Sequence, residues 1–329
     1  MKKLMVFLCL VLLAALGCGR GGDEGKLKVG YVVNYMSHEW YQNICKAARQ
    51  RAAEMDVDLV IADANLDVAA QISKAENLIA QGVKVLILTP ADAKALDALV
   101  RQAREAGLYV ITESNLVPGS DTYVGIDNKE SGKKAGRWYA EYAKANQLSP
   151  QILIIGVPNF EDCRLRVEGF KEALAESGIA YQIAQEVDGQ GLKEKAFKAA
   201  QDALTAHPEV NAIFGINDDS TTGGMAAYQA AGLDEAKLTA IGFGFEGIVG
   251  QTALLGHTPY KAALAMFPNF VGLSLVEAAV ALGKGETLPP HYETPTTMIT
   301  LDNFNTFYRQ EGQGYVMNFD AIRRLLPAR

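Results

Sequence analysis

The strongest constraint on this chain is a strand–helix alternation that occurs twice along it. From residue 27 to residue 115, short apolar runs such as LKVGYVV and VKVLILT alternate with segments of helical periodicity, and the alternation returns from 151 to 244. VKVLILTPAD, starting at Val83, aligns without a gap with VNAIFGINDD, starting at Val210. Strands joined through helices run parallel, because the right-handed crossover returns the chain to the same end of the sheet. The sequence therefore predicts an α/β fold with two doubly wound parallel-sheet lobes.

Each lobe has its own predicted elements. In the first half we expect strands over 27–33, 57–64, 83–89 and 108–112, and helices over 37–55, 67–80 and 92–106 that begin at Ser37, Asp67 and Asp92. In the second half we expect strands over 151–157, 179–186, 210–216 and 238–244, and helices over 162–176, 192–206 and 219–231. Ligands of open parallel sheets bind at the carboxyl ends of the strands, so two facing lobes predict a ligand cleft between them.

The segment NYMSHEWY, residues 34–41, follows the first predicted strand and starts the next helix. Trp40 and Tyr41 lie in the first helical turn, beside His38. Aromatic faces at a cleft stack on the C–H faces of sugars or on planar rings, although one of the two can instead belong to the helix core. We expect at least one of Trp40 and Tyr41 to touch the ligand.

Signatures of catalysis, metals and cofactors are scarce. The four histidines have no metal-ligand spacing, and neither a nucleophile elbow nor a Walker-type loop is present. Residues 242–247 fit G-x-G-x-x-G, but no Asp or Glu follows between 248 and 276 to hold the ribose of a dinucleotide. A formal charge of −7 gives no electrostatic footprint for nucleic acid. The sequence therefore favours a binding protein without cofactor or metal, and not an enzyme.

Residues 1–17 have the form of an export signal. Lys2 and Lys3 precede an apolar run, 4–16, that is too short to span a bilayer. ALGC, ending at Cys18, is similar to a bacterial lipobox and predicts a lipid anchor on Cys18, whereas an ordinary secretory signal cleaved elsewhere is the alternative. Residues 18–25 predict a flexible tether. The protein is thus expected outside the cytoplasm, at the periplasmic or extracellular face and anchored in a membrane.

Two further cysteines, Cys45 and Cys163, lie in the predicted lobes. An exported protein can pair them, but a domain of this size does not need a single disulfide. The sequence leaves open whether they pair.

Six segments, in order along residues 27–295, resemble the ribose- and galactose-type periplasmic binding proteins, the solute receptors of ABC importers. They are VGYVVNYMSHEWYQNICKAARQRA, LIAQGVKVLILTPADAKAL, YVGIDNKESGKKAG, RLRVEGFKEAL, LTAHPEVNAIFGINDD and LTAIGFGFEG. The resemblance implies the type I periplasmic binding protein fold, whose lobes close on a ligand by hinge motion. It implies crossovers near Ile126, Met266 and Pro295, hence an N-terminal lobe of 26–126 plus 267–295 and a C-terminal lobe of 127–266 plus 296–329.

Residues 302–329 exceed the core pattern of that family. Phe304, Phe307, Tyr308, Tyr315 and Phe319 make this C-terminal extension too apolar for a free tail, so we expect it to pack on a lobe.

The resemblance also implies which residues of this chain contact the ligand. Arg164 stands where the family arginine binds ring and hydroxyl oxygens, and its guanidinium also suits a carboxylate. Asn217 stands at the family's asparagine after a strand, and Trp40 and Tyr41 stand at the stacking positions. Asp92 follows the third strand, where it can equally be a helix cap.

Other positions depart from the family pattern. Gly244 stands where sugar binders carry an aspartate, and Ser114-Asn115 stands where ribose receptors carry Asp-Arg. Met266 replaces a glutamine and His38 an asparagine. Carboxylates that can substitute for the lost ones, or equally face solvent, are Glu113, Asp218 and Glu246. The predicted ligand contacts are therefore His38, Trp40, Tyr41, Asp92, Glu113, Asn115, Arg164, Asn217, Asp218, Glu246 and Met266.

These patterns predict a monomeric, lipid-anchored solute receptor that closes on a small polar ligand, first a monosaccharide or polyol, and delivers it to an ABC permease. A non-sugar solute, such as a nucleoside or a carboxylated compound, is the alternative ligand. A sensor whose closed form docks on a membrane kinase or chemoreceptor is the alternative role. A transcription factor of the lactose-repressor type shares the two-lobe plan, but it needs an N-terminal helix-turn-helix where this chain has a signal and a tether.

Overall fold

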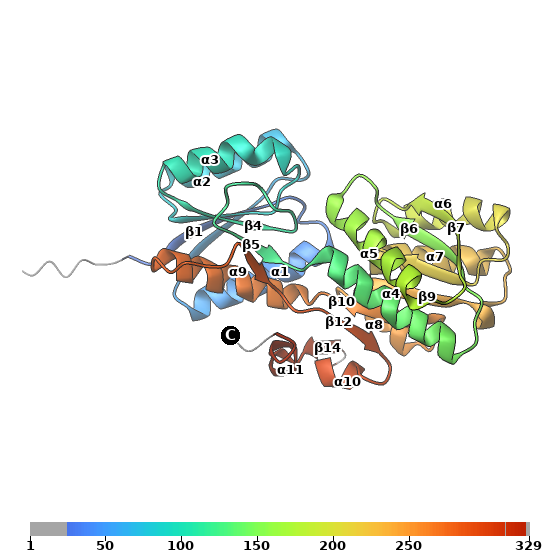
Figure 1. Ribbon diagram of the computed structural model, residues 1–329. Coiled ribbons are helices and arrows are strands. Elements are labelled where there is room, and N and C mark those ends of the chain that lie inside the picture. The colour runs from blue at the N-terminus through green and yellow to red at the C-terminus, as the bar shows by residue number, and fades with distance from the viewer. Residues whose placement is uncertain (1–24, 313, 327–329) are drawn as a thin grey trace, which may run out of the picture.

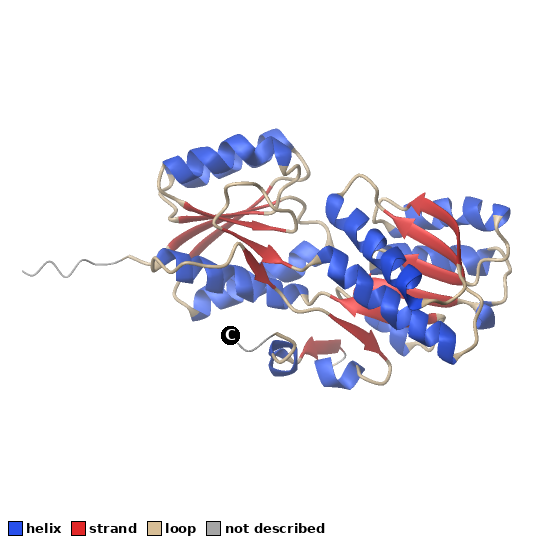
Figure 2. Cartoon of the chain, viewed as in Figure 1, coloured by secondary structure: helices blue, strands red, loops and turns tan. Residues whose placement is uncertain are grey.

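Two six-stranded sheets, one in each lobe, organise the protein in the computed structural model, which describes residues 25–312 and 314–326. Figure 1 shows the lobes side by side, and Figure 2 shows helices covering both faces of each sheet. A sheet covered on both faces needs strands that are apolar throughout, which is why the apolar runs of the sequence coincide with strands.

The first sheet is entirely parallel, with strand order β11-β5-β4-β3-β1-β2. Its strands are β1 (Lys28–Val33), β2 (Asp58–Asp63), β3 (Val85–Leu88), β4 (Tyr109–Glu113), β5 (Thr122–Gly125) and β11 (His291–Glu293). Helices α1 (Glu39–Glu54) and α9 (Pro268–Gly283) cover one face, and α2 (Val68–Ala80) and α3 (Asp97–Glu105) cover the other. Alternate residues of β1 serve the two faces, since Tyr31 joins the core under α1 and Val32 joins the core under α2 and α3.

The second sheet has the order β12-β10-β9-β8-β6-β7, and only β12 runs antiparallel to its neighbour. Its strands are β6 (Gln151–Gly156), β7 (Gln182–Asp188), β8 (Ala212–Gly215), β9 (Thr239–Gly244), β10 (Tyr260–Ala265) and β12 (Thr297–Thr300). The helices of this lobe are α4 (Asn128–Ala145), α5 (Glu161–Ser177), α6 (Lys193–Ala206), α7 (Asp218–Ala230) and α8 (Ile248–Leu255).

Helices α4 and α5 pack together through glycines. A Cβ added to Gly132 would lie 2.1 Å from the carbonyl oxygen of Arg166, and one added to Gly169 would lie 2.0 Å from that of Lys129. The two backbones therefore approach more closely than any larger residue permits, and this contact sets the position of Arg166.

The chain passes between the lobes three times. The passages lie between β5 and α4, between β10 and α9, and between β11 and β12. As a result, α9 and β11 complete the first lobe although they follow the second lobe's strands in the sequence.

The C-terminal extension packs near β10 and β12 of the second sheet. It contains α10 (Phe304–Phe307), the hairpin of β13 (Tyr308–Glu311) and β14 (Gly314–Met317), and α11 (Phe319–Arg323). Phe304 and Ile322 are buried in one cluster with Phe245 and Phe267. Arg323 reaches the first lobe's helix α9, where its guanidinium lies 5.5 Å from the ring centroid of Phe270. The extension thus touches both lobes.

The start of α1 differs from the one expected, and the state of the two cysteines, which the sequence left open, is defined. The helix expected to begin at Ser37 is instead capped by His38, whose Nδ1 accepts a hydrogen bond from the backbone N–H of Trp40. Cys45 and Cys163 are both free and buried. No helix within the described ranges is long and apolar enough to cross a membrane. The predicted signal and Cys18 lie outside the described residues.

Candidate functional site

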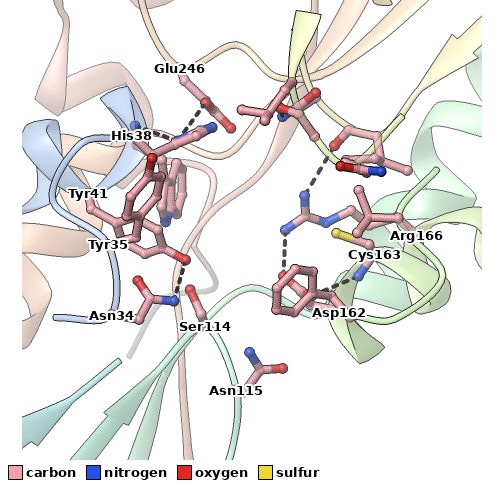
Figure 3. A pocket seen from close by; sticks show the side chains of 18 of the residues that line it. Asn34, Tyr35, His38, Tyr41, Ser114, Asn115, Asp162, Cys163, Arg166 and Glu246 are labelled. Carbon is pink, nitrogen blue, oxygen red and sulfur yellow. Dashed lines mark hydrogen bonds and ion pairs between the residues drawn. The ribbon is translucent and has the colours of Figure 1, made fainter. Parts of the chain in front are cut away.

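A cleft of about 250 Å³ lies between the two lobes, at the carboxyl ends of their strands. Figure 3 shows Asn34, Tyr35, His38 and Tyr41 on one side of it and Asp162, Cys163 and Arg166 on the other. Of the predicted ligand contacts, the structure brings seven to this cleft, namely His38, Trp40, Tyr41, Asn115, Asn217, Glu246 and Met266. Arg164, Asp92, Glu113 and Asp218 do not line it.

The first-lobe wall is built from the turn between β1 and α1. Both Trp40 and Tyr41 line the cleft, while Trp40 also packs into the core and is only 8% exposed. The side-chain amide of Asn34 donates a 3.1 Å hydrogen bond to the hydroxyl of Tyr41. Asn34 is 5% exposed, and its Oδ1 has no hydrogen-bond partner. That oxygen has almost no accessible surface, so Asn34 contributes to the cleft by positioning the hydroxyl of Tyr41.

The second-lobe wall centres on Arg166, a residue that the sequence analysis did not select. Its Nε donates to Oδ1 of Asn128 at 2.9 Å, Nη1 to the carbonyl oxygen of Ile216 at 3.2 Å, and Nη2 to Asp162 at 3.3 Å. Its guanidinium also lies 4.8 Å from the ring centroid of Phe243. Within the described residues, one N–H on each Nη nitrogen stays without a partner, so the fixed guanidinium can present two donors to ligand oxygens.

Arg164 does not occupy the place predicted for it. It is exposed, and its Nη1 donates a 3.2 Å hydrogen bond to the carbonyl oxygen of Pro158 outside the cleft. Two residues along a helix are about 200° apart around its axis, so Arg164 and Arg166 face opposite directions. Arg166 shares its helix face with the buried Gly169, Phe170 and Ala173, a periodicity that could have identified it from the sequence.

Two predicted carboxylates do not line this cleft, although Glu113 borders a small neighbouring cavity that Trp40 and Arg166 also line. Glu113 is 1% exposed and accepts hydrogen bonds from the hydroxyls of Thr89 at 2.7 Å and Ser114 at 2.9 Å. Asp218 is 3% exposed and accepts from the hydroxyl of Tyr260 and, at 2.9 Å, from the backbone N–H of Glu246. Burial raises the pKa of Glu113 to about 7 and that of Asp218 to about 8. Both carboxyls therefore serve internal hydrogen bonds of the wall.

Asp92 is exposed at the start of the helical segment before α3. Its Oδ1 accepts a 3.1 Å hydrogen bond from the backbone N–H of Ala95. Asp92 is therefore a helix cap, and it lies outside the cleft.

Glu246 is the carboxyl that does line the cleft. Burial raises its pKa to about 8, and the same effect lowers the pKa of His38, whose Nδ1 lies 3.8 Å from Oε2 of Glu246. Because Nδ1 of His38 also accepts from Trp40, a neutral imidazole facing a protonated carboxyl fits this geometry better than an ion pair does.

Asn217 caps α7. Its Oδ1 accepts from the backbone N–H of Ser220 at 2.8 Å, and its Nδ2 donates to the carbonyl oxygen of Gly191 at 2.9 Å. The second-lobe wall therefore presents fixed hydrogen-bond donors and acceptors opposite the aromatic first-lobe wall. This combination suits rings that carry many hydroxyls. Within the described residues, no cluster of His, Cys, Asp or Glu could hold a metal ion.

Known proteins match this chain along most of its length. The ribose import binding protein RbsB of Escherichia coli (strain K12) is 27% identical over 301 residues, which cover 91% of this chain and 98% of the relative. RbsB of Bacillus subtilis (strain 168) is 25% identical over 281 residues, which cover 85% of this chain and 89% of the relative.

Solved structures show the same fold. One is a solute-binding protein of an ABC transporter from Mycobacterium smegmatis with bound glycerol. It has a TM-score of 0.77 at 25% identity, and the match covers 87% of this chain and 98% of that protein's chain. The Caulobacter myo-inositol binding protein, bound to myo-inositol, has a TM-score of 0.73 at 25% identity and covers 85% of this chain and 95% of its own. These matches confirm the predicted two-lobe fold.

A family model described as a periplasmic binding protein domain matches residues 29–287. Its members are solute-binding receptors rather than a class of enzymes, and their family implies export to the periplasm. Since the match spans most of the chain, this protein belongs to the periplasmic binding protein domain family.

Proposed function

We propose that this protein is an extracytoplasmic receptor that closes over a monosaccharide or polyol and delivers it to an ABC permease. The observation that carries the proposal is the buried guanidinium of Arg166, fixed by three hydrogen bonds and facing an aromatic wall across the cleft. Hydroxyl oxygens of a sugar can accept from its remaining N–H groups while the ring stacks on Trp40 or Tyr41. The relatives named above as ribose and myo-inositol binding proteins support this ligand class.

Closure is the step that links binding to transport. A ligand that contacts both walls binds the closed conformation better than the open one, so it increases the fraction of molecules that are closed. Among our proposed contacts, Trp40 and Tyr41 belong to the first lobe and Arg166 and Asn217 to the second. The receptor acts in this proposal as a monomer without catalysis, and the permease recognises the closed form.

Thermal unfolding with candidate ligands tests the receptor role. Purified protein, unfolded and refolded to remove bound ligand, is heated with D-ribose, D-allose, myo-inositol or glycerol. A ligand present at about 100 times its Kd stabilises the folded state by about 2.7 kcal/mol, so its addition should raise Tm by several degrees. The proposal would be rejected if no sugar, polyol or sugar derivative raised Tm while an organic acid did.

The lipid anchor is a separate part of the proposal and rests on the sequence around Cys18 alone. Cells that express the chain should incorporate labelled palmitate into it, and Cys18→Ser should abolish the label. Equal labelling of both forms would exclude Cys18 as the anchor.

A further inference from the structure

The mouth of the cleft is mostly apolar, with Gln190 as the exposed polar residue that also lines it. Leu66, Phe160 and Leu192 all line the cleft that contains Arg166, although they are 50%, 44% and 44% exposed. They come from three loops, which follow β2, β6 and β7. Single exposed apolar side chains are ordinary, but three that converge on one cavity from both lobes indicate an apolar partner.

Leu66 is held in this position against its own backbone preference. Its φ is +60° and that of Asn65 is +50°, in the left-handed region that a leucine rarely adopts. The turn is fixed by two hydrogen bonds, from the N–H of Leu66 to the carbonyl oxygen of Asn34 at 2.7 Å and from the N–H of Asn65 to Oδ1 of Asp63 at 2.9 Å. Strain of this kind is retained at functional sites, and here it holds an apolar side chain over the cleft.

The polar groups of the cleft lie deeper than this mouth. Arg166 and Asn217 are 9% and 6% exposed, and Asn34 is 5% exposed. A free monosaccharide carries hydroxyls on every side, and those directed outward would lie beside Leu66, Phe160 and Leu192, with Gln190 as the exposed polar side chain there. Unpaired hydroxyls against apolar side chains are unfavourable, whereas an apolar or planar substituent at that point would be buried favourably.

We infer that the preferred ligand is a glycoside, in which a sugar ring carries an apolar or planar substituent. The ring binds among Asn34, Arg166 and Asn217, and the substituent lies between Leu66 of the first lobe and Phe160 and Leu192 of the second. This inference rests on the proposed function and names the chemical class of its ligand. A nucleoside and an alkyl or aryl glycoside share the required chemistry.

Calorimetry with matched ligands tests the inference. The probes are D-ribose, phenyl β-D-ribofuranoside and adenosine, together with D-glucose and phenyl β-D-glucopyranoside. We expect a substituted sugar to bind about tenfold or more tightly than its parent, as apolar groups in fitting pockets do. Preference for the phenyl riboside or for adenosine then distinguishes a simple apolar substituent from a nucleobase. A parent sugar that bound as tightly as its derivatives would overturn the inference but leave the receptor role intact, whereas a lack of binding by all five probes would overturn both.

Variants of the mouth separate this role from a structural one. Leu66→Asn suits the left-handed backbone, because asparagine tolerates that conformation, and Phe160→Ser changes an exposed side chain. In each variant the ratio of the two Kd values, parent over substituted sugar, should fall toward one. Leu148→Asn is the matched control, since Leu148 is 38% exposed and lies away from the cleft, and it should keep the ratio of the unaltered protein. An unchanged ratio in both mouth variants would contradict the inference.

Discussion

The side-chain amide of Asn43, on α1 of the first lobe, donates a 2.9 Å hydrogen bond to the backbone carbonyl of Glu246, in the loop after β9 of the second lobe. The carboxyl of the same Glu246 faces His38 at 3.8 Å. A single second-lobe residue therefore contacts the first turns of α1 with both its backbone and its side chain. Protonation or ionisation of this carboxyl therefore changes the charge at the contact between the two lobes.

Folding stability should fall as pH rises from about 4 to about 8. Burial raises the pKa of Glu246 and of Asp218 to about 8 and that of Glu113 to about 7. Between the ordinary carboxyl pKa and these values, the folded protein holds protons that the unfolded chain has released, so the stabilisation present at low pH is lost as pH rises. Urea unfolding at several pH values should show a decline on the order of a few kcal/mol. Glu246→Gln should make the decline shallower, and a flat or rising stability over this range would contradict the assignment.

Ligand affinity should depend on Arg166 and not on Arg164. Arg166→Lys keeps the charge but loses the planar set of donors, and hydrogen bonds to charged groups contribute about 1.5–3 kcal/mol each, so a loss of about tenfold to a hundredfold in affinity is expected. Arg164→Lys, on the opposite and exposed face of α5, should leave Kd unchanged. Calorimetry with whichever sugar stabilises the protein measures both variants, and circular dichroism checks that both are folded. Equal effects of the two substitutions would refute this placement.

Much of the fold could be predicted because its strands are buried on both faces. The run expected over 238–244 differs from β9, Thr239–Gly244, by one residue, and the helix cap expected at Asp67 is present on α2. Strand β11 could not be predicted in this way, since its three residues, HYE, are too few to define an alternation and form a strand through pairing with β5.

The site was less predictable than the fold. The aromatic pair, Trp40 and Tyr41, could be placed because its position relative to β1 and α1 is local information. The arginine was assigned to the wrong helix face although the periodicity of α5 distinguishes the two candidates. Asp218 could not be placed, because its direction depends on the hydroxyl of Tyr260, which becomes its neighbour only in the folded sheet.

Gly132→Ala should weaken both stability and ligand binding. The new Cβ would lie 2.1 Å from the backbone oxygen of Arg166, so α4 and α5 must move apart. Overpacking of this kind costs about 1–3 kcal/mol, and the displaced guanidinium should lower ligand affinity. Gly314→Ala is a suitable control because an added Cβ there has no atom within 4 Å. Urea unfolding and calorimetry should therefore separate the two variants, and similar results for both would argue against the proposed helix contact.

Neither cysteine should react with a thiol reagent in the folded protein. Cys45 and Cys163 are 0% and 8% exposed. Burial raises the pKa of Cys45 to about 12 and also raises that of Cys163, so the reactive thiolate is scarce at both. Titration with Ellman's reagent at pH 8 should give no rapid reaction until denaturant is added, after which both thiols should react. Rapid labelling without denaturant would show that one of them is accessible.

Phe304→Ala should destabilise the protein by about 3–5 kcal/mol, as other buried phenylalanines do when truncated. Phe304 is 2% exposed, and its ring stacks on Tyr308 with centroids 5.1 Å apart. Leu301→Ala, at a residue that is 41% exposed, should change stability by less than about 0.5 kcal/mol. Chemical denaturation of both variants measures the difference, and a small effect of Phe304→Ala would mean that the extension contributes little to the second lobe.

The late position of α9 and β11 in the chain has a consequence for how the protein acquires its structure. The edge strand and a covering helix of the first sheet lie at residues 268–293, after almost all of the second sheet has been made. The N-terminal third of the chain therefore emerges with one sheet edge unpaired and one face covered only by α1, and it cannot finish folding before the rest arrives. Such long-range contacts slow folding and expose incomplete sheets to aggregation.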